Sequence, residues 1–334
     1  MFVTVSVILT ALVAVLVLVA LAAGILSLFG CRFRRVFVRG LWFLLLPVLL
    51  FFYGMLVERN IYKVSDVEVS SPGVPSGFDG YRIVQISDLH LASFRFRPNS
   101  LERAVKKINS LEPDLVLFTG DMVTSHPSEM DGLEDILSGI KARDGVLSVL
   151  GNHDYCIYHR WASDSLRAEA VKEVVRRQEA MGWRVLMNSH ADFVRCGKTG
   201  DSSGPCDTIS VAGVENISES AYFPSYGDLD KAMSGVRGSF RILMTHDPTH
   251  WRKALSGYPC IDLTLSGHTH AMQFSVFGWS PSSLMFPENR GLYSADTGGH
   301  ENLLYVNIGL GETAIPSRIG TPPEITLITL RHRE

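Results

Sequence analysis

Five short apolar runs in this chain each end in side chains that are able to bind a metal ion. Helical patterns at 100–111 and near 133–141 separate the first three runs, and this alternation predicts an α/β fold. In such folds, binding sites gather at the carboxyl ends of the strands. The runs and the residues that follow them are 81–86 with Asp88 and His90, 114–118 with Asp121, 145–150 with Asn152 and His153, 240–244 with His246, and 261–265 with His268 and His270.

Each of these groups has an ordinary structural explanation when it is taken alone. Asp88 or Asp121 can stabilise a turn, and Asn152 can occupy a loop after a glycine. The pair His268 and His270 is more informative, because residues two apart in an extended chain project to the same side. Five such groups at equivalent strand ends are hard to explain separately, so we interpret them as one metal site.

The types of ligand indicate which metals this site would bind. Aspartate and histidine without cysteine favour a borderline divalent metal, namely Mn, Fe, Zn, Co or Ni, over calcium. The candidate ligands are too many for one ion that must keep a position open for water. Two ions that share a carboxylate would use all of them. Two ions about 3.5–4 Å apart activate water and stabilise the oxygens of a phosphoryl displacement. We therefore expect two divalent ions, with Mn as the first choice.

The order of the motifs along the chain resembles a known family. The sequence resembles the calcineurin-like metallophosphoesterases from about Tyr81 to the C-terminus. The segments 85–90 and 272–274, together with the apolar N-terminus, are similar to the transmembrane YkuE-type branch, which is also similar to the LpxG-type hydrolases of UDP-2,3-diacylglucosamine. The motifs that carry the resemblance are Asp88-x-His90, Gly120-Asp121, Gly151-Asn152-His153-Asp154, His246 and Gly267-His268-x-His270.

The resemblance implies a four-layer αββα sandwich and a metal-dependent phosphoric ester or pyrophosphate hydrolase. It implies that a hydroxide bridging the two metals attacks phosphorus, while His153, next to Asn152, protonates the leaving group. The implied metal ligands are Asp88, His90 and His270 for the first ion, Asn152, His246 and His268 for the second, and Asp121 for both.

One position departs from the family pattern. Many members have a second acid three residues after the bridging aspartate, where it pairs with the catalytic histidine, but this chain has Thr124 there. Either Asp154 or a backbone carbonyl would have to orient His153 instead.

The first 57 residues are almost entirely apolar. Residues 2–29 carry no charge, and about 20 apolar residues suffice for a transmembrane helix. A signal peptide fits poorly, because no basic segment precedes the run and no small-x-small cleavage site follows it. We predict a transmembrane hairpin over 1–57 with spans at about 2–29 and 36–57, a linker and first strand over 58–80, and the metallophosphoesterase domain over 81–334.

The charges between the two spans predict an orientation in the cell membrane. Four arginines at positions 32, 34, 35 and 39 indicate a cytoplasmic loop, which places the catalytic domain outside the cytoplasm. Cys196 and Cys206 flank a Gly/Ser-rich turn, and a disulfide between them would suit an oxidising compartment. Two unpaired thiols are equally compatible with the sequence.

The expected partners are the membrane lipid and a phosphorylated small-molecule or lipid-linked substrate. The net charge of -3 and the lack of a basic patch argue against nucleic acid. UDP-2,3-diacylglucosamine, from the lipid A pathway, is the substrate to which the resemblance points, but it would be expected on the cytoplasmic side, in conflict with the arginine-based orientation. The alternative function is a non-catalytic binding or scaffold protein with this fold. Every expected ligand position is filled, which favours an enzyme.

Overall fold

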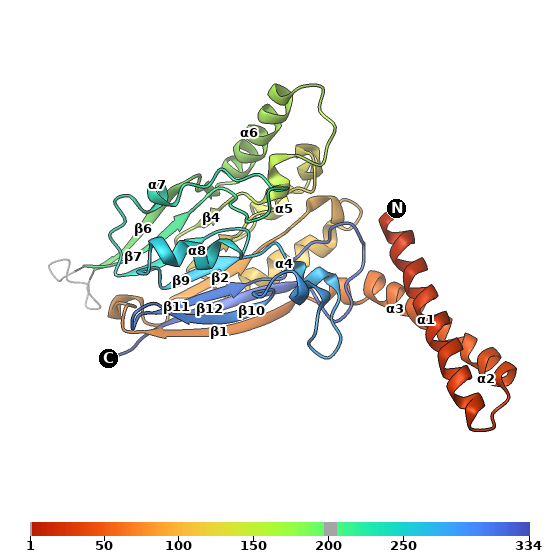
Figure 1. The fold of residues 1–334 in the computed structure, drawn as a ribbon. Coiled ribbons are helices and arrows are strands. Elements are labelled where there is room, and N and C mark those ends of the chain that lie inside the picture. Colours follow the sequence, from red (N-terminus) through yellow and green to blue (C-terminus); the bar gives the residue numbers. More distant parts are fainter. Residues whose placement is uncertain (1, 197–205) are drawn as a thin grey trace.

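Two stacked six-stranded sheets organise the chain after the hairpin (Figure 1). The computed structural model describes residues 2–196 and 206–334. The first sheet has the order β1-β12-β2-β3-β4-β5 and the second the order β10-β11-β9-β8-β7-β6. The strands are β1 (Lys63–Ser71), β2 (Arg82–Ile86), β3 (Leu115–Phe118), β4 (Val146–Ser148), β5 (Arg184–Val185), β6 (Ser189–Cys196), β7 (Cys206–Gly213), β8 (Phe240–Met244), β9 (Leu263–Ser266), β10 (Gly291–Asp296), β11 (Glu301–Val306) and β12 (Glu324–His332).

Helices cover the outer face of each sheet and complete four layers. The first sheet packs on α4 and α6 through a core that includes Leu101 and Val174, and the second packs on α8 through Trp251. These layers confirm the predicted αββα sandwich. The helices are α1 (Phe2–Leu28), α2 (Phe33–Gly40), α3 (Leu45–Leu56), α4 (Pro98–Asn109), α5 (Glu134–Leu137), α6 (Asp164–Ala180), α7 (Leu229–Met233) and α8 (His250–Gly257).

The side-chain alternation of β2 shows why its sequence is apolar on both faces. Ile83 enters the core between the two sheets, whereas Val84 and Ile86 enter the core beneath the helices. Strands of a parallel sheet that is covered on both faces are apolar throughout. Because β2, β3 and β4 are parallel neighbours, their carboxyl ends lie at one edge of the first sheet. The parallel neighbours β8 and β9 likewise end at one edge of the second sheet.

Two elements differ from the sequence prediction. The helix expected near 133–141 is only α5. No strand is predicted at β10, an edge strand that pairs antiparallel with β11. Intermediate and exposed residues alternate along β10, so it lacks the continuous apolar run of the buried strands.

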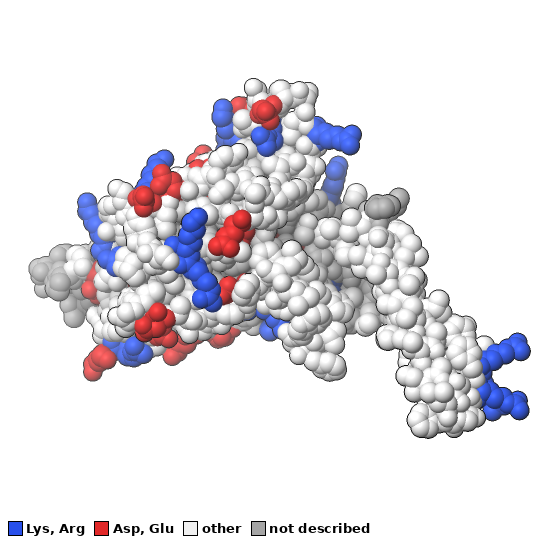
Figure 2. Space-filling view, viewed as in Figure 1, with Lys and Arg blue, Asp and Glu red and all other residues white. Residues whose placement is uncertain are grey.

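The N-terminal segments form two antiparallel apolar helices beside the sandwich (Figure 1). Helices long and apolar enough to cross a membrane cover Val3–Leu28 and Phe33–Asn60, close to the predicted spans. Arg32 lies in the turn before α2, and Arg34, Arg35 and Arg39 lie on α2 itself. Figure 2 shows the rest of the hairpin in this view without charged side chains. The Ser317 hydroxyl donates to the Phe51 carbonyl at 3.1 Å, which joins α3 to the sandwich.

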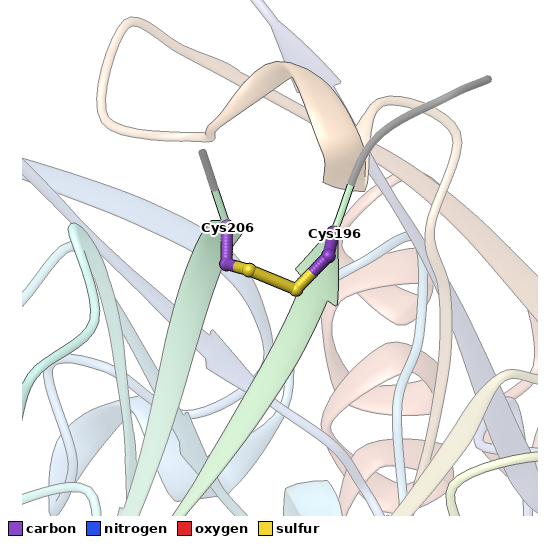
Figure 3. The surroundings of a disulfide bond; sticks show 2 residues. All are labelled: Cys196 and Cys206. Atoms are coloured by element: carbon purple, nitrogen blue, oxygen red, sulfur yellow. A yellow bond between two sulfur atoms is a disulfide. The ribbon is translucent and has the colours of Figure 1, made fainter. Parts of the chain in front are cut away.

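A disulfide joins Cys196 and Cys206 at the facing ends of β6 and β7 (Figure 3). The two residues are directly paired in the antiparallel ladder, with 4.2 Å between their Cα atoms. The structure therefore contains the first of the two alternatives that the sequence allowed.

Candidate metal centre

The loops after the ligand-bearing strands are strained at the candidate ligands themselves. Asp88, His90, Asp121, His268 and His270 have positive φ angles of 50°, 42°, 62°, 73° and 48°. L-residues rarely adopt this left-handed region, and such outliers cluster at functional sites. Backbone hydrogen bonds hold the loops against each other, since the Asp88 amide donates to the Gly120 carbonyl at 2.8 Å and the His90 amide to the Asp121 carbonyl at 3.1 Å.

Gly120 is required where three of these loops meet. Its φ is 99°, and a Cβ atom there would lie 2.6 Å from the Gly151 amide nitrogen and 2.8 Å from Nδ1 of His246. Any other residue would push the β3, β4 and β8 loops apart. The glycine of the Gly120-Asp121 motif therefore serves close approach as well as the turn.

Asp88, His90 and His270 form the first cluster of candidate ligands. Nε2 of His270 lies 3.2 Å from Oδ1 of Asp88 and 3.0 Å from Nε2 of His90. All three side chains are buried. The cluster joins β2 of the first sheet to β9 of the second, although the residues lie far apart in the sequence.

Asp121, His246 and His268 form the second cluster. Nε2 of His246 lies 3.1 Å from Oδ2 of Asp121, and Nδ1 of His268 lies 3.3 Å from Nε2 of His246. The same Oδ2 lies 3.6 Å from Nε2 of His90, on the side of the first cluster. Oδ1 of Asp121 accepts the His153 amide at 2.9 Å, so one oxygen is fixed by the backbone and the other faces both clusters.

Asn152 provides a test of whether these residues fit a metal. Its Oδ1 atom is buried and has no hydrogen-bond partner among the described residues. Its Nδ2 atom donates to the Tyr158 hydroxyl at 3.3 Å, which fixes the orientation of the amide. A buried carbonyl oxygen without a partner is costly, and a cation would remove that cost. Together with the imidazoles and carboxylates, this oxygen completes a donor set that suits divalent metals.

His153 is oriented by a backbone carbonyl. Its Nδ1 lies 2.6 Å from the Thr124 carbonyl oxygen, which can only accept, so Nδ1 carries the hydrogen. Thr124 is the position where many family members have an acid, and here its main chain makes this contact. The Tyr158 ring stacks on His153 with 4.3 Å between centroids.

Asp154 supports the loops and does not orient His153. Its carboxylate accepts the amides of Asp121 at 2.9 Å, Val123 at 3.1 Å and Gly151 at 2.9 Å. These bonds tie the loop after β3 to the loop after β4. Burial, followed by the nearby Asp121 charge, raises the pKa of Asp154 to about 7.

The electrostatics of the centre show opposite charges held at close range. Burial alone would raise the pKa of Asp121, but His246 and His153 outweigh burial and lower it well below its usual value. Burial lowers the pKa of His246, yet the Asp121 charge raises it to about 10. Burial lowers the pKa of His90 and of His268. His90 and His268 are therefore held neutral beside ionised carboxylates, as metal binding requires, whereas His246 is protonated beside Asp121 and would have to release its proton to a bound metal.

Two residues near the centre were missed by the sequence analysis. Oδ2 of buried Asp247 lies 3.9 Å from Nε2 of His268, on the opposite side of the ring from His246. Its place directly after His246 was the available signal. Fully buried Arg318 donates to the Ile308 carbonyl at 3.0 Å and lies 3.3 Å from Nδ1 of His270. No pattern around Arg318 indicates this position.

Known proteins are similar to most of the length of this chain. A transmembrane protein with metallophosphoesterase domain from Danio rerio is 33% identical over 295 residues, which cover 86% of this chain and 62% of that relative. The metallophosphoesterase YkuE of Bacillus subtilis is 30% identical over 285 residues, covering 84% of this chain and 89% of YkuE. The UDP-2,3-diacylglucosamine pyrophosphatase LpxG of Chlamydia muridarum is 28% identical over 316 residues, covering 84% and 93%.

The chain thus spans about three fifths of the length of the Danio rerio relative. Its two apolar helices and this transmembrane relative support localisation to a membrane. The family model for calcineurin-like phosphoesterases matches residues 81–272, a range that includes all five ligand-bearing strand ends. The chain therefore belongs to the calcineurin-like phosphoesterase family.

Proposed function

We propose that the chain is a membrane-anchored phosphoesterase that depends on two divalent metal ions. The observation that carries the proposal is the position of Asp121. Its carboxylate belongs to the second cluster, with His246 and His268, and also to a third cluster, with His90 and His153. A carboxylate shared in this way suits two neighbouring ions.

The proposed ligands divide between the two ions. Asp88, His90 and His270 hold the first ion, Asn152, His246 and His268 hold the second, and Asp121 holds both, with Mn as the first choice. When bound, the ions supply Lewis-acid activation of water and of the phosphoryl group. The family implies divalent metals, and the three clusters of candidate ligands support this assignment.

His153 acts as the general acid in this proposal. The Thr124 carbonyl holds the hydrogen of Nδ1, which leaves Nε2 free to carry the proton that the leaving oxygen needs. A positioned general acid contributes about 10²–10⁴-fold to the rate. Asn152 lies beside it and contributes as a ligand.

The proposed substrate is a lipid-linked phosphate or pyrophosphate. The apolar hairpin would keep the centre near a bilayer. One of the relatives, LpxG, is a UDP-2,3-diacylglucosamine pyrophosphatase. We place the catalytic domain outside the cytoplasm, supported by the arginines between the helices and by the disulfide. Protease digestion of intact spheroplasts tests this placement, and protection of the domain would overturn it.

The activity test uses the full chain in detergent or nanodiscs with Mn²⁺. The panel is bis(p-nitrophenyl) phosphate, lipid phosphates, lipid pyrophosphates and UDP-2,3-diacylglucosamine. We expect turnover by the wild type, loss of turnover in Asp121→Asn, and normal turnover in His332→Gln, a histidine at the C-terminal end of β12 that pairs with Ser71 of β1. Unchanged turnover in Asp121→Asn would contradict the assignment.

The role of His153 has its own readout. His153→Gln should slow hydrolysis strongly for esters with a poor alkoxide leaving group and weakly for p-nitrophenyl esters, whose leaving group needs no proton. Equal losses with both leaving groups would contradict the role of general acid. A wild type that binds two metals but hydrolyses nothing in the panel would favour the non-catalytic binding protein instead.

A further inference from the structure

A surface segment that follows the last ligand pair is unusually apolar. Residues 271–287 contain no charged side chain. We call residues 272–287 the apolar loop. Phe277 is fully exposed, Leu284 is 79% exposed and Met285 is 65% exposed, and Val276 and Trp279 are also exposed. Large apolar side chains that gather on one exposed segment indicate an interaction site.

The apolar loop is a built structure that holds these side chains outward. Val276 and Trp279 exchange backbone hydrogen bonds of 2.9 and 3.0 Å around a tight turn. Phe277 has a φ of 49° within this turn, a strained conformation for a bulky residue. The buried Ser280 hydroxyl donates to the Ala271 carbonyl at 2.5 Å and anchors the second part of the loop. The exposure of Phe277 is therefore imposed by the local fold.

The base of the apolar loop lies next to the membrane hairpin. The Ser275 amide donates to the Ile319 carbonyl at 2.8 Å, and Phe274 bridges to Ile319. Two residues before Ile319, Ser317 bonds to Phe51 of α3. In Figure 1 the blue loop between β9 and β10 projects from the sandwich on the side of α3, and Figure 2 shows an uncharged surface there.

The other end of the apolar loop reaches the metal centre. The Phe286 ring meets the His268 ring edge to face at 5.5 Å between centroids. The Thr269 hydroxyl donates to the Asn289 carbonyl at 2.5 Å, which closes the loop onto the ligand-bearing turn. One short segment therefore connects a proposed metal ligand with an apolar tip beside the hairpin.

We propose that the apolar loop inserts its tip into the interface of the bilayer that the hairpin crosses. Exposed aromatic and aliphatic side chains suit the boundary between head groups and acyl chains, where tryptophan is enriched. The nearby Arg290 guanidinium donates to the Gly278 carbonyl and, at 3.2 Å, to the Ser275 hydroxyl, and a cation suits the level of the head-group phosphates. The base of the loop is bonded to the segment that contacts α3, so the bilayer around α3 is the partner nearest to the loop. The loop then holds the metal centre toward phosphate groups at the membrane surface, and this second statement rests on the proposed function.

The lipid contact is tested on the full chain in proteoliposomes. Phe277→Cys is labelled with an environment-sensitive fluorophore after Cys31→Ser and Cys260→Ser remove the exposed and half-buried free thiols. The matched control is Leu166→Cys, on an exposed apolar position of α6. We expect quenching by lipids that carry doxyl groups at position 277 and little at position 166. Equal quenching at the two positions would overturn the proposal.

Contact between two copies of the chain is the alternative occupant. Energy transfer between labelled copies at position 277 that persists on dilution into excess lipid, without quenching by doxyl lipids, would assign the loop to self-association and overturn the proposal.

The catalytic consequence is tested separately with a variant that combines Phe277→Ser, Trp279→Ser, Leu284→Ser and Met285→Ser. We expect hydrolysis of a vesicle-borne lipid phosphate to fall at least about tenfold, since lipid contact is lost, while kcat/KM for soluble bis(p-nitrophenyl) phosphate changes much less. Equal losses on both substrates would contradict presentation of lipid phosphates by the loop. A wild type inactive on both substrates would refute the proposed function, whereas the quenching result would still decide the lipid contact.

Discussion

The first sheet and the second sheet contribute chemically different halves of the candidate metal centre. The loops after β2, β3 and β4 supply both carboxylates of the proposed ligand set, Asp88 and Asp121, together with Asn152 and one imidazole, His90. The loops after β8 and β9 supply three imidazoles. Each carboxylate faces an imidazole from the other sheet, at 3.2 Å for Asp88 with His270 and 3.1 Å for Asp121 with His246. The negative charge that would attract a cation thus lies in the first half, and the second half adds imidazole nitrogens, of which His246 must first lose a proton.

The two halves also differ in how they are held. The carboxylate of Asp154 ties the first-sheet loops together through three backbone amides. In the second half, the turn from His270 to Gln273 is left-handed throughout and continues into the apolar loop. The first half is therefore the more internally bonded, whereas the second is continuous with a surface segment.

The largest expected effect comes from removing charge in the first half. Asp121→Asn should lower kcat/KM by about 10³-fold or more and reduce the bound metal toward zero, because both ions lose their shared carboxylate. His246→Asn should remove about one ion per chain. Metal content by mass spectrometry, combined with kinetics, separates the two variants. Equal metal loss would show that the halves do not divide as described.

Asp154 and Asp247 test the difference in support. Asp154→Asn should lower the free energy of unfolding by about 2–3 kcal/mol, because buried amides lose a charged acceptor. Asp247→Asn should cost about 1 kcal/mol, since the bonds that the Asp247 carboxylate accepts within the described residues come from Thr249, and its nearest His268 nitrogen is 3.9 Å away. Asp164→Asn, at a fully exposed side chain of α6, is the control for loss of charge. Denaturant unfolding in detergent measures all three, and a larger cost at Asp247 would reverse the comparison.

The disulfide tests whether the second sheet can be weakened away from the centre. The double variant Cys196→Ser, Cys206→Ser should lower the free energy of unfolding by about 2–3 kcal/mol, because it releases a closed loop with a sequence separation of 10. The bridge lies at the end of β6 and β7, so metal content should not change. Loss of metal in this variant would show that the strands of the second sheet transmit strain to the ligands.

The smallest effect is expected at the left-handed turn of the second half. Met272 is half-exposed and has a φ of 49°, so Met272→Gly should raise the free energy of unfolding by about 0.5 kcal/mol as strain relief exceeds the entropic cost of glycine. Met285→Gly, at a φ of -107°, is the matched control and should lower stability. If both variants lose stability equally, the turn stores no strain.

The fold was predictable from the sequence because its buried strands are continuous apolar runs, which are easy to recognise. Runs such as Leu115–Phe118 are apolar throughout, and parallel neighbours end at a common edge, so polar residues after them meet in space. The apolar hairpin was visible for the same reason. Edge strand β10 was not, because half-exposed residues give a weak pattern.

The support of the centre could not be predicted in the same way. The contact of the Thr124 carbonyl with His153 depends on main-chain geometry, which a side-chain motif does not record. Arg318 comes near His270 from a segment without regular structure, and its partners are backbone carbonyls. The exposure of Phe277 depends on a strained turn, and the sequence alone is equally compatible with a buried phenylalanine.

The pairing of β12 determines when the first sheet can be completed during synthesis of this chain. β12 lies between β1 and β2, and it pairs parallel with β1 from Lys63 to Ser71 and antiparallel with β2. Among the described residues, the strand that directly follows the hairpin has no other neighbour in its sheet, so it stays unpaired until β12 has left the ribosome. Because such distant pairing is slow, the hairpin should already be in the bilayer while the first sheet is incomplete. A nascent chain that stops before Glu324 would leave β1 and β2 as open sheet edges at the membrane surface, a substrate for quality-control proteases.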